Sequence, residues 1–370
     1  MKITLPRQDL LSAVNKVKSV VAAKTSLPIL SHVLMETGES CVTFSGTDLK
    51  VSIECEVDCS VERPGSATVN CQRLAMLLAE LPDMDVTLDA GEGNFCYLRC
   101  GQVETRLFTM PSDEFPPIRS FSGGNPLQLK QSMLRRLFLK TSFAICTDQA
   151  RYNLTGLLFQ LRDRRLTVVA TDGRRMSVAI SEEEVDTDQE IKVIIPSKMI
   201  HELEALLDGD GESLVSVQIE ESQAGFFLDR LKIVTSLIEG NFPNYDAVLP
   251  KKHDREVVLD TETFMSSVRR AFVMTSDKFR NVRLVASDGA LKIIVKTPEV
   301  GEQDDVIPAE YSGDPVEIAF NPAFILDVLK NIEGEKVCLM LKDTSSPGLI
   351  KPYTDAPEDT YLNVVMPIRI

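Results

Sequence analysis

Three aspartates are the residues whose type and spacing could support catalysis. Asp48, Asp172 and Asp288 each follow a β-branched, apolar run, at intervals of 124 and 116 residues. Carboxylates that converge on a divalent metal can hydrolyse a phosphodiester. Aspartate in a turn, however, accepts hydrogen bonds from its own backbone, and equivalent places in separate repeats would keep the three side chains apart. We therefore interpret them as turn residues, with a metal-dependent nucleic-acid hydrolase as one alternative.

Other catalytic signatures are missing from the sequence. The three histidines, His32, His201 and His253, are far apart, and neither HExxH nor a Cys/His ligand spacing occurs. There is no GxxxxGK[ST] or GxGxxG loop and no GxSxG turn. The eight cysteines include no CxxC pair, which indicates reduced thiols. We predict no catalytic residue, no metal and no cofactor.

The composition is that of an ordinary globular chain. Its 370 residues are 44% hydrophobic and 26% charged, which allows two or three domains. The net charge of −15 argues against a simple nucleic-acid binder, unless the bases gather on one surface. No apolar stretch of membrane-spanning length occurs, and the first six residues lack the apolar core of a secretion signal. We expect a cytoplasmic protein.

The elements around the aspartates repeat along the chain. The run 166–170, the turn 171–175 and the alternating run 176–180 predict two strands joined by a tight turn. Similar turns at 47–51 and 287–291 predict the same hairpin three times. Asn70, Pro196 and Asn321 stand before short amphipathic segments at intervals of 126 and 125 residues, which predicts a capped helix in each repeat over 71–81, 198–207 and 323–331.

A second helix is predicted near the start of each repeat. Apolar residues recur at helical spacing over 9–21, 131–145 and 263–274, each after a strand-like run. The chain is therefore interpreted as three α+β copies of about 120 residues each, which is a normal domain size. We predict domains at 1–123, 124–253 and 254–370, arranged as a curved or ring-like array.

Positive charge is concentrated on these first helices. Across 9–21, 130–145 and 263–274, eight basic residues stand against one acid, in a chain with 55 acids and 40 bases. Long basic side chains without interleaved aromatics suit contact with phosphates rather than base reading. Such binding would be independent of sequence and sensitive to salt, while the acidic remainder would repel DNA elsewhere.

The chain resembles a known family over its whole length, the bacterial sliding clamps that are the β subunit of DNA polymerase III. The most specific pieces of the resemblance are Leu27–Leu30, Gly46–Leu49, Ala170–Met176, Phe242–Tyr245 and the C-terminal Met-Pro-x-Arg-x.

The resemblance implies a DNA clamp fold. It has three similar domains, each with two helices packed on antiparallel sheets, and two chains form a ring head to tail around double-stranded DNA. It also implies a non-catalytic processivity subunit of the DNA polymerase III holoenzyme in DNA replication. A hydrophobic cleft between domains two and three would bind short motifs of the replicative polymerase, the clamp loader and repair proteins. The alternatives are the hydrolase and a monomeric DNA-binding scaffold.

Matching positions give three sets of site residues. The resemblance places Lys24, Arg73, Tyr152 and Lys198 near DNA, and the charge count adds Arg135, Arg136, Lys140, Arg269 and Arg270. The partner-peptide cleft would comprise Leu154, Thr171, Gly173, Arg175, Met176, Pro243, Val248, Asn321, Phe324, Val364, Met366, Pro367, Ile368 and Arg369. The dimer interface would comprise Leu107 of domain one and Val273 and Met274 of domain three.

The chain departs from the family pattern near this cleft. Where many members have Phe-Pro-Asp-Tyr-Arg-Arg-Val, residues 242–248 read Phe-Pro-Asn-Tyr-Asp-Ala-Val. Arg174 stands where a histidine is common, and residues 345–348 replace a more strand-like segment. We expect these changes to alter which flanking residues of a partner motif are preferred.

Overall fold

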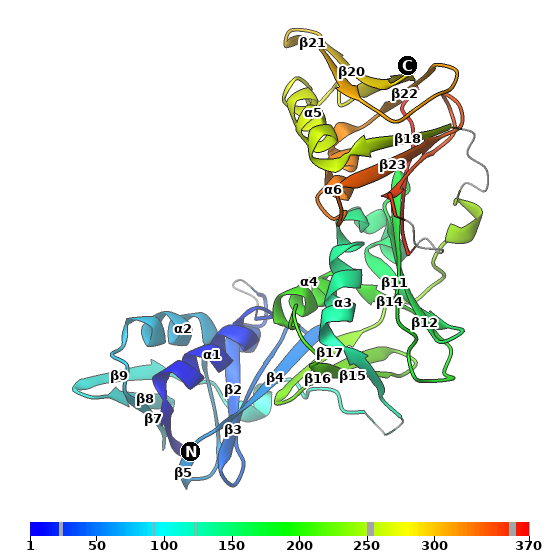
Figure 1. Cartoon of the computed structure of the whole chain (residues 1–370). Helices are drawn as coiled ribbons and strands as arrows, with labels where there is room; N and C mark the ends of the chain where they lie inside the picture. The colour runs from blue at the N-terminus through cyan, green and yellow to red at the C-terminus, as the bar shows by residue number, and fades with distance from the viewer. Residues whose placement is uncertain are drawn as a thin grey trace. The chain divides into compact units, whose positions relative to one another are not determined.

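The computed structural model describes residues 1–21, 25–91, 93–121, 123, 125–249, 255–354 and 360–369. The chain forms two compact units (Figure 1). The first combines Met1–Ser132 with Lys198–Leu237, and the second combines Met133–Ser197 with Ile238–Ile370.

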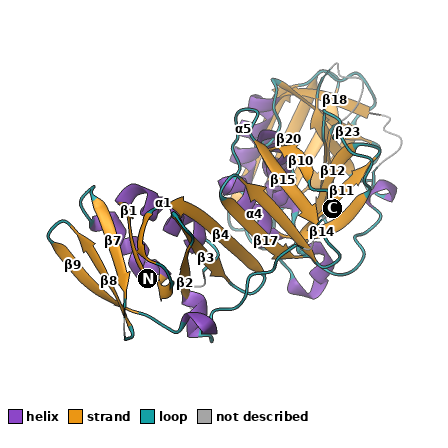
Figure 2. Ribbon diagram, turned by 90° about the horizontal axis from the view of Figure 1, so that it is seen from below, coloured by secondary structure: helices purple, strands orange, loops and turns teal. Residues whose placement is uncertain are grey.

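The first unit contains two antiparallel sheets with helices packed on them. Its strands are β1 (Lys2–Pro6), β2 (His32–Thr37), β3 (Cys41–Thr47), β4 (Val51–Asp58), β5 (Ser60–Arg63), β6 (Ser66–Asn70), β7 (Asp85–Ala90), β8 (Phe95–Cys100), β9 (Val103–Phe108), β10 (Leu127–Lys130), β15 (Leu214–Ile219), β16 (Gln223–Leu228) and β17 (Leu231–Ser236). Its helices are α1 (Arg7–Lys18), α2 (Cys71–Glu80) and α4 (Ser197–Leu206). The sheet orders are β5-β1-β7-β8-β9 and β10-β15-β16-β17-β4-β3-β2-β6, so β9 is an outermost strand (Figure 2).

The amphipathic pattern positions these helices as predicted. Leu10, Val14 and Val17 are fully buried on one face of α1, which packs against α2, β3 and β4. Burial of such a side chain stabilises the fold by roughly 1.5–3 kcal/mol. The helix α2 begins where predicted, because the Asn70 carboxamide oxygen accepts a hydrogen bond from the Arg73 amide at 3.0 Å.

The second unit repeats this design. Its strands are β11 (Gly156–Arg162), β12 (Arg165–Thr171), β13 (Arg175–Ile180), β14 (Ile191–Pro196), β18 (Arg255–Asp260), β19 (Val282–Ser287), β20 (Ala290–Thr297), β21 (Gly301–Pro308), β22 (Val316–Phe320), β23 (Lys336–Leu341), β24 (Gly348–Pro352) and β25 (Tyr361–Val365). Its helices are α3 (Gln131–Leu139), which begins in the first unit, α5 (Thr261–Val273) and α6 (Pro322–Leu329). The sheet orders are β14-β11-β12-β13-β25-β24-β23-β18 and β21-β20-β19-β22, which makes β21 outermost.

One helix is shorter than predicted. The periodicity predicted a helix over 131–145, but α3 ends at Leu139. Two residues later the Thr141 hydroxyl donates to the carbonyls of Leu137 and Phe138, and Thr141 itself leaves helical geometry with φ −129°. The apolar residues beyond it belong to a separate 3-10 turn, Ser142–Ala144. Their spacing therefore continued the helical pattern although the backbone did not.

Each eight-stranded sheet runs across two sequence repeats. In the first unit β4 pairs with β17, and in the second β13 pairs with β25. We call the β4–β17 pairing the first seam and the β13–β25 pairing the second seam. Both have the same register, because the fifth residue of one strand faces the first residue of the other: Cys55 lies opposite Leu231, and Ala179 lies opposite Tyr361. Each unit therefore joins one outer repeat to half of the middle repeat through a continuous sheet.

The third aspartate turn is not the counterpart of the first two, so this prediction was wrong. Asp48 and Asp172 join the third and fourth strands in the orders β6-β2-β3-β4 and β14-β11-β12-β13, whereas Asp288 joins β19 and β20, one hairpin earlier in β22-β19-β20-β21. The true counterpart is the turn after Thr297, as three shared features show. The buried strand ends at Thr47, Thr171 and Thr297, a residue with φ of 76°, 78° and 67° follows at Leu49, Gly173 and Glu299, and the next strand starts at Val51, Arg175 and Gly301. Pro298 in place of an aspartate concealed the match.

Candidate functional site

The turn Thr171–Arg175 is built by its own side chains. The Asp172 carboxylate accepts hydrogen bonds from the amides of Arg174 and Arg175 at 2.8 and 2.9 Å, and the Thr171 hydroxyl donates to the Arg175 carbonyl at 2.7 Å. Gly173 has φ +78°, and a Cβ atom there would lie 3.1 Å from the Arg151 guanidinium. Glycine is therefore the residue that this position favours. The interpretation of Asp172 as a turn residue is confirmed.

Arg175 joins this turn to α6. Its guanidinium donates to Asp172 at 3.2 Å, to Asp327 at 2.6 Å and to the Phe143 carbonyl at 2.5 Å. It also lies 4.6 Å from the centroid of the Phe324 ring. Only 13% of the side chain is exposed, so these three hydrogen bonds replace much of the hydration of the charge. The structure thus brings together Arg175 and Phe324, two residues predicted for the cleft.

An apolar cluster lies beneath this network. Leu154, Met176, Val364 and Phe242 are buried in one hydrophobic cluster in the second unit. Met176 and Val364 face each other directly in the β13–β25 pairing. The β13–β25 pairing thus brings into contact two residues that are nearly 200 positions apart in the sequence. Three predicted cleft residues therefore share one packed core.

The C-terminal segment continues from this cluster. The Met366 amide donates to the Arg174 carbonyl at 2.9 Å, and the Ile368 amide donates to the Ala319 carbonyl at 2.8 Å. These bonds hold the segment against the turn at Met366 and against β22 at Ile368. The Met366 side chain is 40% exposed and Val248 is 43% exposed. Both are apolar surfaces that a ligand could cover.

The remaining predicted cleft residues have local structural functions or are exposed. The Asn321 side chain caps α6 by accepting from the Ala323 amide at 3.0 Å, and Pro243 is an exposed neighbour of buried Phe242. Sequence reasoning missed Asp327 and Phe143, which accept hydrogen bonds from Arg175 and lie outside its turn. Neither carries a signal in the sequence, because an aspartate inside a helix is indistinguishable there from a solvated one.

The first seam has an ion pair at the corresponding turn. Asp48 accepts from the Lys198 ammonium at 2.6 Å and from the Lys50 and Val51 amides at 2.9 and 2.7 Å. Burial alone would raise the pKa of Asp48, but the hydrogen bond from Lys198 and those from the two amides outweigh it and hold the pKa below its usual range. Lys198, which was predicted to face DNA, thus also forms an ion pair that links the first repeat to the middle repeat.

The basic residues predicted to face DNA differ in whether they already form an ion pair with a carboxylate of the same chain. Arg73 and Arg269 are exposed and form no ion pair within the described residues. Arg136 pairs with Glu182 at 3.4 Å, Lys140 with Glu333 at 3.3 Å and Arg270 with Asp305 at 2.5 Å. Lys140 is the least accessible, with 12% of its side chain exposed. A phosphate would have to compete with these carboxylates.

The other residues of this set are placed by different elements. Tyr152 is 48% exposed on the 3-10 segment Gln149–Leu154, and Arg135 lies half-buried on α3. Lys24 lies outside the described residues. The prediction that all nine residues contact DNA stays a prediction.

The residues predicted at the dimer interface lie on outer elements of their units. Leu107 belongs to the edge strand β9, and Val273 is the last residue of α5 with 76% of its surface exposed. The Met274 methyl group lies 3.2 Å from where a Cβ atom of Gly301 would stand, at the start of the edge strand β21. Sequence reasoning missed Phe108, which is 73% exposed beside Leu107.

No group of metal-binding side chains assembles within the described residues. No helix in the part of the chain that the structure describes is long and apolar enough to cross a membrane. Three α+β repeats joined by seam sheets, with basic helices and exposed edge strands, define a scaffold protein of the DNA clamp class.

Comparison with known proteins gives the family. Models of the DNA polymerase III beta subunit match the chain in order: the N-terminal domain at residues 1–119, the central domain at 128–244 and the C-terminal domain at 246–369. The beta sliding clamp of Vibrio cholerae is 32% identical over 371 residues, covering all of both chains. The beta sliding clamp of Pseudomonas aeruginosa is 33% identical over 373 residues, again covering both chains fully.

Solved structures agree with this result. The crystal structure of DNA polymerase III subunit beta from Pseudomonas aeruginosa superposes with a TM-score of 0.95 at 32% identity, covering all of both chains. The subunit from Bartonella birtlesii, solved bound to griselimycin, gives 0.95 at 30% identity with the same coverage. The chain belongs to the family of DNA polymerase III beta subunits, the beta sliding clamps. It is a sliding clamp with the three-domain clamp fold and a non-catalytic processivity subunit, so the predicted family, fold class and function are confirmed and the hydrolase alternative is wrong.

Proposed function

We propose that two copies of this chain close head to tail into a ring around double-stranded DNA and tether the DNA polymerase to it. The observation that carries the proposal concerns two of the outermost strands, β9 on the first unit and β21 on the second. In the first seam β4 pairs with β17, and in the second seam the equivalent strands β13 and β25 pair. The strands β4 and β13 thus form one set of equivalent strands, and β17 and β25 form the other. The strands β21 and β9 are the third members of these two sets, so a second copy would supply the missing partner of each.

The internal seams give the register of this third seam. The strands β17, β25 and β9 begin at Leu231, Tyr361 and Val103, and β4, β13 and β21 begin at equivalent residues after the threonine turns. The shared register would set Gly301 opposite Leu107 and Glu302 opposite Arg106 of the second copy. Met274 lies beside Gly301, so the predicted dimer residues would meet at one place. Such heterologous contacts, made twice, close a two-fold ring.

Charge reversal tests this register. Arg106→Glu or Glu302→Arg alone should weaken the dimer about tenfold or more, since each of the two contacts loses a cross-strand pair worth up to ~1 kcal/mol and gains repulsion. The double variant should recover the dimer. Sedimentation at several concentrations gives the dissociation constant. Single variants that dimerise like the wild type would overturn the register, and a monomeric wild type would overturn the ring.

The DNA contact would be made by the basic residues of the helices and nearby turns. Arg73 and Arg269 are the strongest candidates, because each has an exposed guanidinium without a carboxylate partner among the described residues. Arg135, Arg136, Lys140, Tyr152, Lys198, Arg270 and Lys24 are proposed as further contacts. The binding needs no sequence preference, since phosphate contacts carry none. A ring can use weak contacts because it leaves DNA only by opening or by sliding off an end.

Partner motifs would bind over the Leu154, Met176 and Val364 cluster and the C-terminal segment. Griselimycin is bound by the subunits from Pseudomonas aeruginosa and Bartonella birtlesii, and we extend this binding to the present chain. The exposed apolar surfaces of Val248 and Met366 beside a fixed strand end support the proposal. The replicative polymerase, the clamp loader and repair proteins are the proposed partners. Titration with griselimycin would test this surface, and lack of binding would contradict it.

Two further assignments complete the proposal. The protein works in the cytoplasm, where chromosomal DNA is replicated. Its domains are 1–123, 124–253 and 254–370, a division supported by the three successive family matches.

A further inference from the structure

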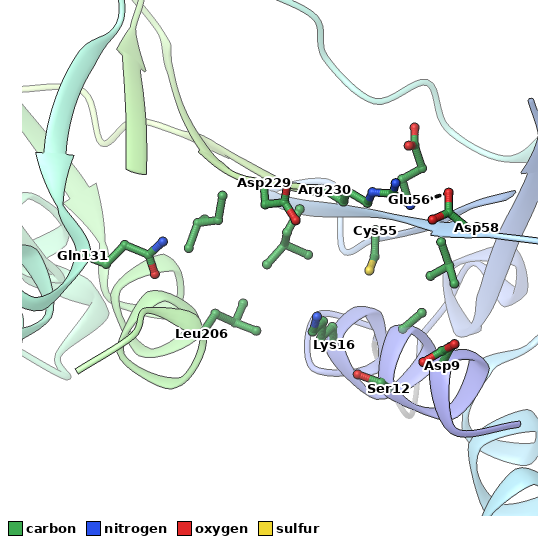
Figure 3. A pocket seen from close by; sticks show the side chains of 14 residues that line it. Asp9, Ser12, Lys16, Cys55, Glu56, Asp58, Gln131, Leu206, Asp229 and Arg230 are labelled. Carbon is green, nitrogen blue, oxygen red and sulfur yellow. Dashed lines mark ion pairs between the residues drawn. The ribbon is translucent and has the colours of Figure 1, made fainter. Parts of the chain in front are cut away.

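A cavity of about 480 Å³ lies in the first seam (Figure 3). Lys16 of α1 and Leu206 of α4 line it from two helices, and Cys55 of β4 lies on the sheet side. Ala13 and Leu231 add further buried apolar surface. The volume is in the range of sites for small ligands. This cavity is separate from the residues proposed above for DNA, for partner motifs and for the dimer.

The second seam shows how the equivalent space is filled. The buried positions of α1 and α3 correspond at a constant interval, Leu10 with Leu134 and Val14 with Phe138, so Lys16 corresponds to Lys140. The shared strand register makes Leu231 the counterpart of Tyr361. In the second seam the Lys140 ammonium lies 5.3 Å from the centroid of the Tyr361 ring, which is 2% exposed.

A second difference enlarges the space in the first seam. In the second unit Arg136 forms an ion pair with Glu182 of the same repeat. The corresponding residues in the first unit are Ser12 and Asp58, and Asp58 pairs with Arg230 of the middle repeat instead. A phenol ring and a long guanidinium side chain are thus replaced by leucine and serine. The Lys16 ammonium has no ion-pair partner in the described part of the chain. The cavity is therefore the place of a missing aromatic ring.

We propose that this cavity binds an aromatic ring carried on a cationic chain, as in an arylalkylamine or a tyrosine flanked by lysines. The ring would lie under Lys16 against the leucines, as Tyr361 lies under Lys140, in a cation–π contact. Exposed acidic residues at the cavity determine which charge the chain attached to the ring should carry. Asp9, Glu56 and Asp229 are exposed carboxylates that line the cavity, and they outnumber Lys16. They would attract a cationic chain and repel an anionic one.

Binding would also connect two repeats. Lys16 and Cys55 come from the first repeat, while Leu206, Asp229 and Leu231 come from the middle repeat. An occupant would therefore touch both partners of the first seam, as Tyr361 does in the second. A ligand that binds only the folded protein would stabilise it by RT ln(1 + [L]/Kd), so the stabilisation grows with the ligand concentration.

Ligand-detected NMR on the full-length protein tests the proposal with tyramine and with 4-hydroxyphenylacetate, which has the same ring on an anionic chain. Tyramine should bind, and the anion should bind at least about threefold more weakly, since each exposed charge contact contributes up to ~1 kcal/mol. A blocked Lys-Tyr-Lys peptide that binds tighter than tyramine would identify a peptide as the ligand, whereas tighter tyramine would identify a small amine. Failure of both probes, or equal binding of the anion, would overturn the proposal.

Variants locate the binding to the cavity. Leu231→Tyr should abolish tyramine binding by supplying the missing ring, while Leu214→Tyr, the same change at a 53% exposed leucine, should bind like the wild type. If Leu231→Tyr does not fold, the exposed double change Glu56→Gln and Asp229→Asn serves instead. It should weaken tyramine at least about threefold and leave neutral p-cresol unchanged. Tyramine binding that is unaffected by a folded cavity variant would overturn the assignment.

Discussion

Replacing Arg175 with alanine should weaken the contact between the turn Thr171–Arg175 and α6. The same change should weaken ligand binding at the partner-peptide cleft. The guanidinium is 13% exposed and donates to Asp172, Asp327 and the Phe143 carbonyl. Breaking a buried ion pair by removing one partner costs about 3–5 kcal/mol. The two carboxylates keep 18% and 30% of their surface in water, so hydration recovers part of that cost. We expect a loss of about 2–3 kcal/mol.

The magnitude converts to a measurable shift. In a unit of this size 1 kcal/mol moves the melting temperature by about 2–4 °C, so the second unit should melt roughly 5–10 °C lower. Because the Phe324 ring loses the cation 4.6 Å from its centroid, griselimycin should bind at least about tenfold more weakly, as expected when a central anchor is disturbed. Differential scanning calorimetry and titration calorimetry measure the two effects.

Arg174→Ala is the matched control. Arg174 is the preceding arginine in the same turn, but its side chain is exposed, and only its backbone carbonyl bonds Met366. Its removal should leave the melting temperature within about 1 °C of the wild type, since exposed substitutions usually change stability by less than ~0.5 kcal/mol. Equal melting temperatures and equal griselimycin affinities for the two variants would refute the reasoning.

Three further outcomes are expected. Arg269→Glu should shorten clamp residence on DNA and reduce its salt dependence, measured by single-molecule residence times at two salt concentrations, and an unchanged residence time would count against this contact. Asp48→Asn should lower stability by up to ~1 kcal/mol at pH 7. Because the pKa of Asp48 is depressed by folding, this difference should persist above its unfolded pKa of about 4 and vanish as the pH falls through the folded value; urea unfolding that gives a constant difference down to pH 2 would contradict it. Val273→Asp should dissociate the dimer, since it would bury a charge at a residue 76% exposed in the single chain; sedimentation as a stable dimer would exclude it from the interface.

Local sequence signals predicted the elements and the repeat. Five of the six α-helices in the described residues lie within three residues of their predicted bounds, whereas α3 ends six residues early, and Asn70 and Asn321 cap the helices that they were expected to cap. These features depend on residues close together in the chain, and the sequence displays such neighbours directly. The same local reasoning misassigned the turn at Asp288, because Asp-Gly is a strong turn signal wherever two strands meet.

The site depended on long-range pairing, which no local pattern displays. Met176 meets Val364 only because β25 pairs with β13, and Arg175 meets Asp327 only because α6 packs beside that seam. The resemblance to the family supplied the apolar residues by position but gave neither ion-pair partner. Arg135, Arg136, Lys140, Arg269 and Arg270 were found by counting charges. Counting cannot distinguish exposed Arg269 from Lys140, whose side chain is 12% exposed.

The central claim is that the protein acts as a closed ring rather than through its affinity for DNA. Its most direct test compares retention on a nicked circular duplex with retention on the same DNA after linearisation, with the clamp loaded in both cases and the salt held constant. The account predicts long retention on the circle and rapid loss from the linear form, with retention restored when both ends are blocked. Equal loss from circular and linear DNA would contradict it.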